Sequence, residues 1–290
     1  ADGTFAGATS FFPPGTGTTR GLVIQSDGTI VTAGATFESN DSDFTLSRLS
    51  SGLNLLGGTT TTALDGRLFA NDILIQTTPN NDEKILVVGQ QDISGGGSNV
   101  VMVRYLSDGN IDTSFGDNGH VISSFAKYDY GNTAALQADG KILVAGSSND
   151  DFFIARYTAD GVLDTSFGKE GIQTVSLKGG DWVISLTVLD DGKIIAAGQT
   201  EFGSGESDFA LARFNPNGSL DTTFGLDSPK SCSISYTEDS AATVLNSQLN
   251  IIDPELDSAD SYQGATLRIE RDQTPNTDDT FTHTGTLGPL

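Results

Sequence analysis

Arginine and aspartate recur together at one fixed spacing, which is the clearest sign of chemistry in this chain. Each arginine lies near the end of a short apolar segment, and an aspartate follows it within Ile/Leu-Asp-Thr-Ser/Thr-Phe-Gly. The pairs are Arg104 with Asp112, Arg156 with Asp164, and Arg213 with Asp221. A buried guanidinium requires a carboxylate that accepts its N–H groups. We therefore predict structural ion pairs here, not a ligand site.

Residues suited to catalysis are sparse. The two histidines, His120 and His283, are far apart in the sequence and form no nucleophile–base or metal-binding pattern. The carboxylate pairs Asp150–Asp151 and Asp190–Asp191 fall at turns, where aspartate bonds its own backbone. The run Gly95–Gly97 lacks the Gly-Lys-Ser/Thr of a phosphate loop. We therefore expect that the chain is not an enzyme and takes no organic cofactor.

One repeated unit supplies the elements that position the Arg–Asp pairs. Its four copies begin at Asp27, Asp82, Asp139 and Asp191, at intervals of 52 to 57 residues. Repeats of this length are typical of stacked or radial architectures.

Each copy contains four segments with the pattern of short strands, separated by turns such as Asp-Gly. The second segments are continuously apolar and end at glycine, as expected for a central strand that is covered on both faces. The first segments are 21–25, 72–77, 133–137 and 183–189, the second are 30–33, 85–88, 142–145 and 194–197, and the third are 44–49, 100–105, 152–157 and 209–214.

The two ends of the repeat region indicate how it closes. Residues 3–12 resemble the fourth-strand sequence of residues 119–125, and the last copy stops after Gly225. We predict that the N-terminal strand completes the last blade and hides two sheet edges. Exchange of a strand between subunits is the alternative.

The motif Asp-Gly-Lys-Ile-Leu-Val-Ala-Gly at residues 139–146, with residues 151–157 and Leu-Asp-Thr-Ser-Phe-Gly at residues 163–168, resembles the delta-60 repeat. That repeat occurs in large bacterial surface and secreted proteins and implies a β-propeller type of fold, without a particular reaction. We predict an all-β fold, with a small β-propeller of about four four-stranded blades over residues 1–228.

Residues 229–290 resemble the start of a bacterial cadherin-like, immunoglobulin-like module, on the segments 234–239, 251–257 and 264–269. About 60 residues are present, against roughly 100 in a full sandwich. The segment is then an incomplete β-sandwich, which is either part of a longer chain or completed by a strand from a partner.

Calcium is the one cofactor that this resemblance implies. In the family, an acidic loop binds Ca²⁺ between modules, and here that loop is Asp-Pro-Glu-Leu-Asp at residues 253–257. Hard oxygen ligands suit Ca²⁺, and a solvated acidic loop is the alternative. The candidate ligands are Glu238, Asp239, Asp253, Glu255, Asp257 and Asp260.

Composition restricts partners and compartment. With 38 acidic and 15 basic residues the formal charge is −23, which excludes nucleic acid as an expected partner. No apolar run reaches the ~18 residues of a membrane span. The first residues lack a signal pattern, so the start resembles a mature or cropped terminus. The single cysteine, Cys232, excludes an internal disulfide.

The predicted function is a non-catalytic, structural or adhesive role at the bacterial cell surface or outside the cell. The incomplete C-terminal segment predicts self-association through strand exchange, or contact with neighbouring surface modules. The alternative is a ligand-binding module that recognises a glycan, for which the lone Trp182 offers an aromatic face.

Overall fold

The computed structural model describes residues 16–38, 41–177, 179–202 and 206–225. All of them lie in the first of two units into which the chain divides, residues 1–228. The predicted closing strand, the cadherin-like segment, Cys232, His283 and the predicted calcium ligands lie outside the described residues.

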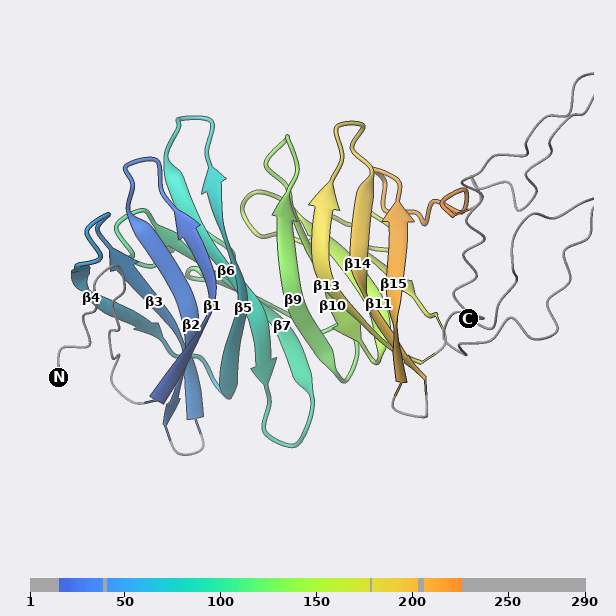
Figure 1. Cartoon of the computed structure of the whole chain (residues 1–290), viewed down its shortest axis with the longest axis horizontal. Helices are drawn as coiled ribbons and strands as arrows, with labels where there is room; N and C mark the ends of the chain where they lie inside the picture. The colour runs from blue at the N-terminus through green and yellow to red at the C-terminus, as the bar shows by residue number, and fades with distance from the viewer. Residues whose placement is uncertain (1–15, 39–40, 178, 203–205, 226–290) are drawn as a thin grey trace, which may run out of the picture. The chain divides into compact units, whose positions relative to one another are not determined.

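Fifteen strands in the described residues form four antiparallel sheets, each built from strands consecutive in sequence (Figure 1). Sheet 1 contains β1 (Thr16–Ile24), β2 (Ile30–Glu38), β3 (Asp41–Leu49) and β4 (Leu55–Thr62). Sheet 2 contains β5 (Arg67–Thr77), β6 (Glu83–Asp92), β7 (Ser98–Leu106) and β8 (His120–Ser123). Sheet 3 contains β9 (Asp129–Leu136), β10 (Ile142–Ser148), β11 (Asp151–Tyr157) and β12 (Ile172–Val175). Sheet 4 contains β13 (Gly180–Val188), β14 (Ile194–Phe202) and β15 (Glu206–Phe214).

The turns between the first and second strands explain why the Asp-Gly pair recurs. In sheet 3, the Asp139 carboxylate accepts the Lys141 N–H at 3.2 Å, and Gly140 between them has a φ of +82°. A side chain disfavours that conformation, whereas glycine adopts it without strain. Asp191 and Lys193 repeat the bond at 3.0 Å. The repeat therefore sets the hairpin that aligns its first and second strands.

The glycine that ends each apolar segment lies opposite a β-bulge. In sheet 3 the pairing of β9 with β10 shifts at Gly146, and a Cβ there would overlap the carbonyl oxygen of Tyr130. Gly198 meets the carbonyl oxygen of Trp182 in sheet 4 in the same way. Bulges increase the local twist of a strand. These glycines recur at the same place in each repeat, and thus produce the same bend in each sheet.

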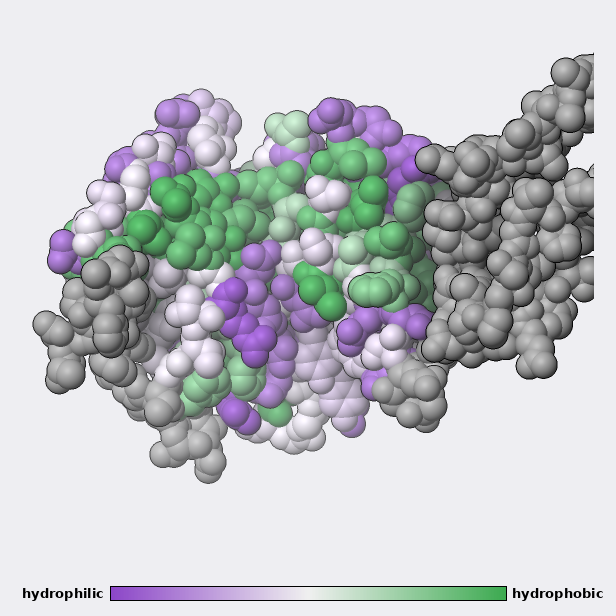
Figure 2. All heavy atoms as spheres, in the orientation of Figure 1, coloured by the Kyte–Doolittle hydropathy of each residue, from purple (hydrophilic) through white to green (hydrophobic). Residues whose placement is uncertain are grey.

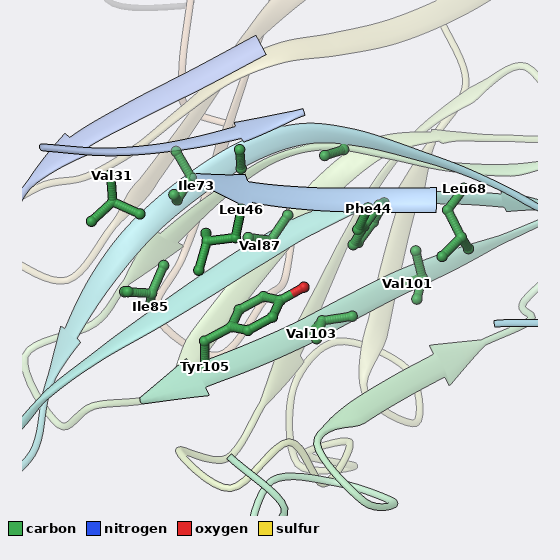
Figure 3. Packing of buried hydrophobic residues seen from close by; sticks show 12 residues of the cluster. Val31, Phe44, Leu46, Leu68, Ile73, Ile85, Val87, Val101, Val103 and Tyr105 are labelled. Carbon is green, nitrogen blue, oxygen red and sulfur yellow. The ribbon is translucent and has the colours of Figure 1, made fainter. Parts of the chain in front are cut away.

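Successive sheets are joined mainly by the first strand of the later sheet. β5 contacts β1, β2 and β3, while β9 contacts β5, β6 and β7, and β13 contacts β9, β10 and β11. Three apolar clusters of buried side chains fill these joints. Figure 3 shows the joint of sheets 1 and 2, where Phe44 and Leu46 lie near Ile73, Val87 and Tyr105. Among the described strands, sheets 1 and 4 share no joint of this kind.

The prediction of an all-β fold with one antiparallel sheet for each repeat is confirmed for the described residues. Sheets 1 to 3 have four strands as predicted, whereas sheet 4 has three described strands. The first copy lacks the Phe-Gly signal but still forms a complete sheet, with the long fourth strand β4. The described residues contain no helix long and apolar enough to cross a membrane.

Candidate interaction surface

The structure brings the three predicted Arg–Asp pairs together. The Nε–Oδ2 distances are 2.9 Å for Arg104–Asp112, 2.8 Å for Arg156–Asp164 and 2.9 Å for Arg213–Asp221. The third strand carries the arginine, and the turn after that strand carries the aspartate.

The aspartate, serine and phenylalanine of the Asp-Thr-Ser-Phe motif all contribute to these pairs. In sheet 3, the Ser166 hydroxyl donates to Asp164 at 2.6 Å and the Phe167 ring lies 4.6 Å from the guanidinium carbon of Arg156. Lys141 adds a second cation at 3.0 Å from the carboxylate. The Ser166 hydrogen bond and the two cations hold the pKa of Asp164 well below its usual range. This carboxylate therefore stays ionised, is already paired with two cations and a hydroxyl group, and is a poor general base.

The same arginines also join neighbouring sheets, which the sequence did not indicate. Arg104 Nη1 donates to the carbonyl oxygen of Ala159 at 2.7 Å, and Arg156 Nη1 donates to that of Pro216 at 2.8 Å. Both acceptors lie in the turn after the third strand of the following sheet. Arg48, which lacks an aspartate partner in its own repeat, donates to the carbonyl oxygen of Asp108 in sheet 2 at 3.0 Å. Arg104 and Arg156 thus each hold their own turn and the next sheet, while Arg48 holds the next sheet.

Sheet 4 repeats the apolar surface of sheet 3 but leaves part of it uncovered. Phe152 and Ile154 on β11 are completely buried beneath sheet 4. Phe209 and Leu211 take their places in the β15 register, yet Phe209 is fully exposed and Leu211 is 58% exposed. We call the outward face of sheet 4 that carries these residues the end face. Large exposed apolar surfaces of this kind mark interaction sites.

The opposite end of the repeat array also exposes apolar side chains. Leu22 and Ile24 on β1 are 57% and 63% exposed. In the registers of β5 and β13, Ile73 and Leu186 match Leu22, and both are buried against the preceding sheet. Figure 2 shows hydrophobic side chains in a band across the upper part of the face that carries β1, β9 and β13.

A shallow hollow of about 430 Å³ lies where sheets 2 and 3 meet. Its walls combine two tyrosines with an arginine, an aspartate and the glycine-rich hairpin between β6 and β7. The glycine run at residues 95–97 lies in this hairpin. The lining residues are Gly66, Arg67, Asp92, Ile93, Ser94, Gly96, Gly97, Tyr128 and Tyr130.

The remaining predicted site residues are not brought together. Trp182 is half-buried on β13, where its ring lies beside Gly180, and His120 is half-buried at the start of β8. Trp182 does not line the hollow between sheets 2 and 3. Within the described ranges, no three His, Cys, Asp or Glu side chains form a group that could hold a metal ion.

Comparison with known families supports the repeat architecture. The family described as a domain of unknown function (DUF5122) beta-propeller matches residues 81–115, 137–167 and 189–224. These segments fall in sheets 2, 3 and 4 and contain all three Arg–Asp pairs. The chain is therefore a β-propeller-like repeat protein. No curated protein sequence matches it.

Two solved structures that match part of this chain are both named glucose dehydrogenase. The first has 13% identity and a TM-score of 0.43, over 66% of this chain and 64% of that structure. The second has 12% identity and a TM-score of 0.42, over 69% of this chain and 61% of that structure. This chain therefore spans less than two thirds of the length of either enzyme.

The expectation that this chain is not an enzyme is corrected by that comparison, because both structures carry the name of an enzyme. The sequence contains few histidines, and its paired aspartates fall at turns. These features showed only that familiar catalytic patterns were missing, which is too little to exclude catalysis. A likeness of this strength is nevertheless confined to the fold and assigns no dehydrogenase activity to the chain.

Proposed function

We propose that this protein is a structural or adhesive element of a bacterial cell surface or secreted assembly, which associates with further copies of itself or with neighbouring modules. The observation that carries the proposal is the end face, where Phe209 and Leu211 are exposed although their counterparts in sheet 3 are buried. Such a surface favours association in water because burial removes apolar area from solvent.

The outer edge of β15 supports the same proposal. In sheets 2 and 3, Gly119 and Gly171 adopt a φ of +99° directly before the fourth strand, and a Cβ at either would overlap a neighbouring side chain. Ser228 takes this place in the fourth copy, and Pro229, which has no N–H, follows it. The sequence after Gly225 therefore lacks the glycine that precedes the fourth strand in sheets 2 and 3.

A strand from elsewhere would complete sheet 4. Residues 3–12 of the same chain would close the repeat array, and a strand from another copy would link two chains. Calcium binding by the acidic residues near Asp253 belongs to the same proposal for the C-terminal segment. The formal charge of −23 suits a saline, calcium-containing exterior.

Light scattering tests the proposal directly. The full chain and a chain that ends after Pro229 would be measured across a range of protein concentrations, with and without millimolar calcium. We expect a mass of at least twice the 30.2 kDa of one full chain. A mass of one chain under every condition would contradict the proposed function.

A second candidate function, glycan binding, is favoured by the hollow between sheets 2 and 3. Tyr128 and Tyr130 supply aromatic faces, while Arg67 and Asp92 supply groups that bond hydroxyls. Screening on immobilised glycans with a Tyr128→Ala/Tyr130→Ala variant tests it, with Trp182→Ala as the matched control. Equal signals from the tyrosine variant and the unchanged chain would remove this candidate.

A further inference from the structure

We propose that the end face of sheet 4 binds β1 of a second copy, so that two chains associate head to tail. The inference rests on the proposed function, because it names the partner and the contact for the same exposed face.

The joints inside the chain show what covers such a face. In each joint the first strand of one sheet lies across the first three strands of the sheet before it. In the joint of sheets 3 and 4, Leu186 on β13 packs in one cluster with Phe152 and Ile154. A face of this repeat is thus shaped to receive the first strand of another repeat.

Sheet 4 supplies one half of such a joint. Leu143, Ala145, Phe152 and Ile154 form the receiving surface of sheet 3. Their counterparts in sheet 4 are apolar at every position and lie on the equivalent second and third strands, β14 and β15. They are Ile195, Ala197, Phe209 and Leu211.

β1 supplies the other half. Leu22 and Ile24 take the places of Leu186 and Val188 in the β13 register, and both project from a sheet that has no described sheet before it. Because the described strands include an exposed receiving face and an exposed first strand, two copies supply complementary partners for both.

The arginine contacts add a polar element to the match. Arg104 and Arg156 each donate to the next sheet, whereas Arg213 has no such acceptor among the described residues, and 19% of its side chain is exposed. The turn closed by Leu53 N–H and Ser50 C=O in sheet 1 corresponds to those that accept from Arg104 and Arg156. Its Ser51 carbonyl takes the place of the Ala159 and Pro216 acceptors, so Ser51 of a second copy is the acceptor we infer for Arg213.

One residue makes this joint looser than those within the chain. Gly161 and Gly218 pack closely against the rings of Phe115 and Phe167. Leu53 takes the corresponding place in sheet 1, with a φ of 63°. The Phe224 ring would meet this larger side chain, so we expect the joint between chains to be reversible.

Head-to-tail contacts form a ring when the rotation between copies closes. Propellers close with four to eight sheets. Two copies with four sheets each reach that upper limit, so we expect a closed pair.

A complementation experiment in the full chain tests this contact. Leu211→Glu damages the end face, Leu22→Glu damages β1, and each variant keeps the other half intact. We expect each variant alone to fall twofold in mass, to the 30.2 kDa of one chain. An equimolar mixture should recover pairs, because the intact β1 of one variant meets the intact end face of the other. The double variant should stay single, and Val162→Glu, at an exposed site away from both surfaces, should behave as the unchanged chain.

Other outcomes overturn the inference in distinguishable ways. Normal association of Leu22→Glu together with loss in Leu211→Glu would mean that two end faces meet each other. Association that survives both substitutions but disappears when the chain ends after Pro229 would mean strand exchange, which keeps the proposed function. A single-chain mass for the unchanged protein at every concentration would remove the inference and the proposed function together. Far-ultraviolet circular dichroism of each variant establishes that it is folded.

Discussion

Sheets 3 and 4 carry nearly the same motif but differ in what surrounds it. Phe152 of sheet 3 is enclosed by a following sheet, and Phe209 of sheet 4 is open to solvent. Arg156 reaches the next sheet, and among the described residues Arg213 bonds its own turn alone. The difference shows that each repeat encodes both halves of a sheet-to-sheet joint, including at the end of the array where no neighbour is described.

The largest difference is expected from removing the two phenylalanine rings. Phe152→Ala should lower the free energy of unfolding by about 3–5 kcal/mol, because it leaves a cavity in a packed joint. Phe209→Ala should change the free energy of unfolding of the single chain by less than about 0.5 kcal/mol. Urea unfolding of both variants measures the contrast. Equal losses would mean that sheet 4 is covered in solution.

A smaller contrast is expected from the two arginines. Arg156→Met removes a buried cation and its bond to Pro216, and should cost about 3 kcal/mol. Arg213→Met lacks the bond between sheets, so its cost should be lower by about 1.5 kcal/mol. Thermal unfolding of both, with Lys169→Met as a surface control, measures the difference. An unchanged midpoint for Arg156→Met would contradict its structural role.

Acid should weaken both sheets through their aspartates. Hydrogen bonds from Ser166 and Thr223 hold the pKa values of Asp164 and Asp221 well below the usual 3.8. Their stabilisation is therefore complete above pH 3.8 and declines as the pH falls from there towards the folded-state pKa values. Urea unfolding between pH 2 and 7 measures it, and Asp164→Asn should flatten the acid limb. A variant with the same acid limb would show that other groups dominate.

Salt should produce the smallest effect, and it acts on the joint between chains. Each chain carries a formal charge of −23, so two copies repel at low ionic strength. Raising NaCl from about 0.05 to 0.5 M shortens the Debye length and should strengthen association modestly. Light scattering of the unchanged chain measures this. Association that weakens with salt would indicate a contact made of ion pairs instead of Phe209 and Leu211.

The local repeat was readable from sequence because its signals are short-range. Asp-Gly turns, apolar second strands and an arginine eight residues before an aspartate all act within one sheet. The fourth strand of sheet 1 was less predictable, because the Phe-Gly signal is absent and the pairing of Leu55–Thr62 with β3 shifts register between Ser47 and Leu49.

Contacts between sheets could not be predicted in the same way. The bond from Arg104 to Ala159 joins residues 55 positions apart, and its acceptor is a backbone carbonyl that any residue type supplies. The exposure of Phe209 was equally hidden, because its sequence context is nearly that of the buried Phe152. A side chain pattern reports which face is apolar, whereas burial depends on what is placed against that face.

The arginine that spans two sheets bears on how such a protein changes length. Sheet 3 has both connections, because its turn accepts the bond from Arg104 of sheet 2 and its own Arg156 donates to sheet 4. A duplicate of such an inner copy would therefore carry both a donor and an acceptor turn, so an array can grow by whole copies. Gene recombination thus acts on a unit that is already compatible with its neighbours.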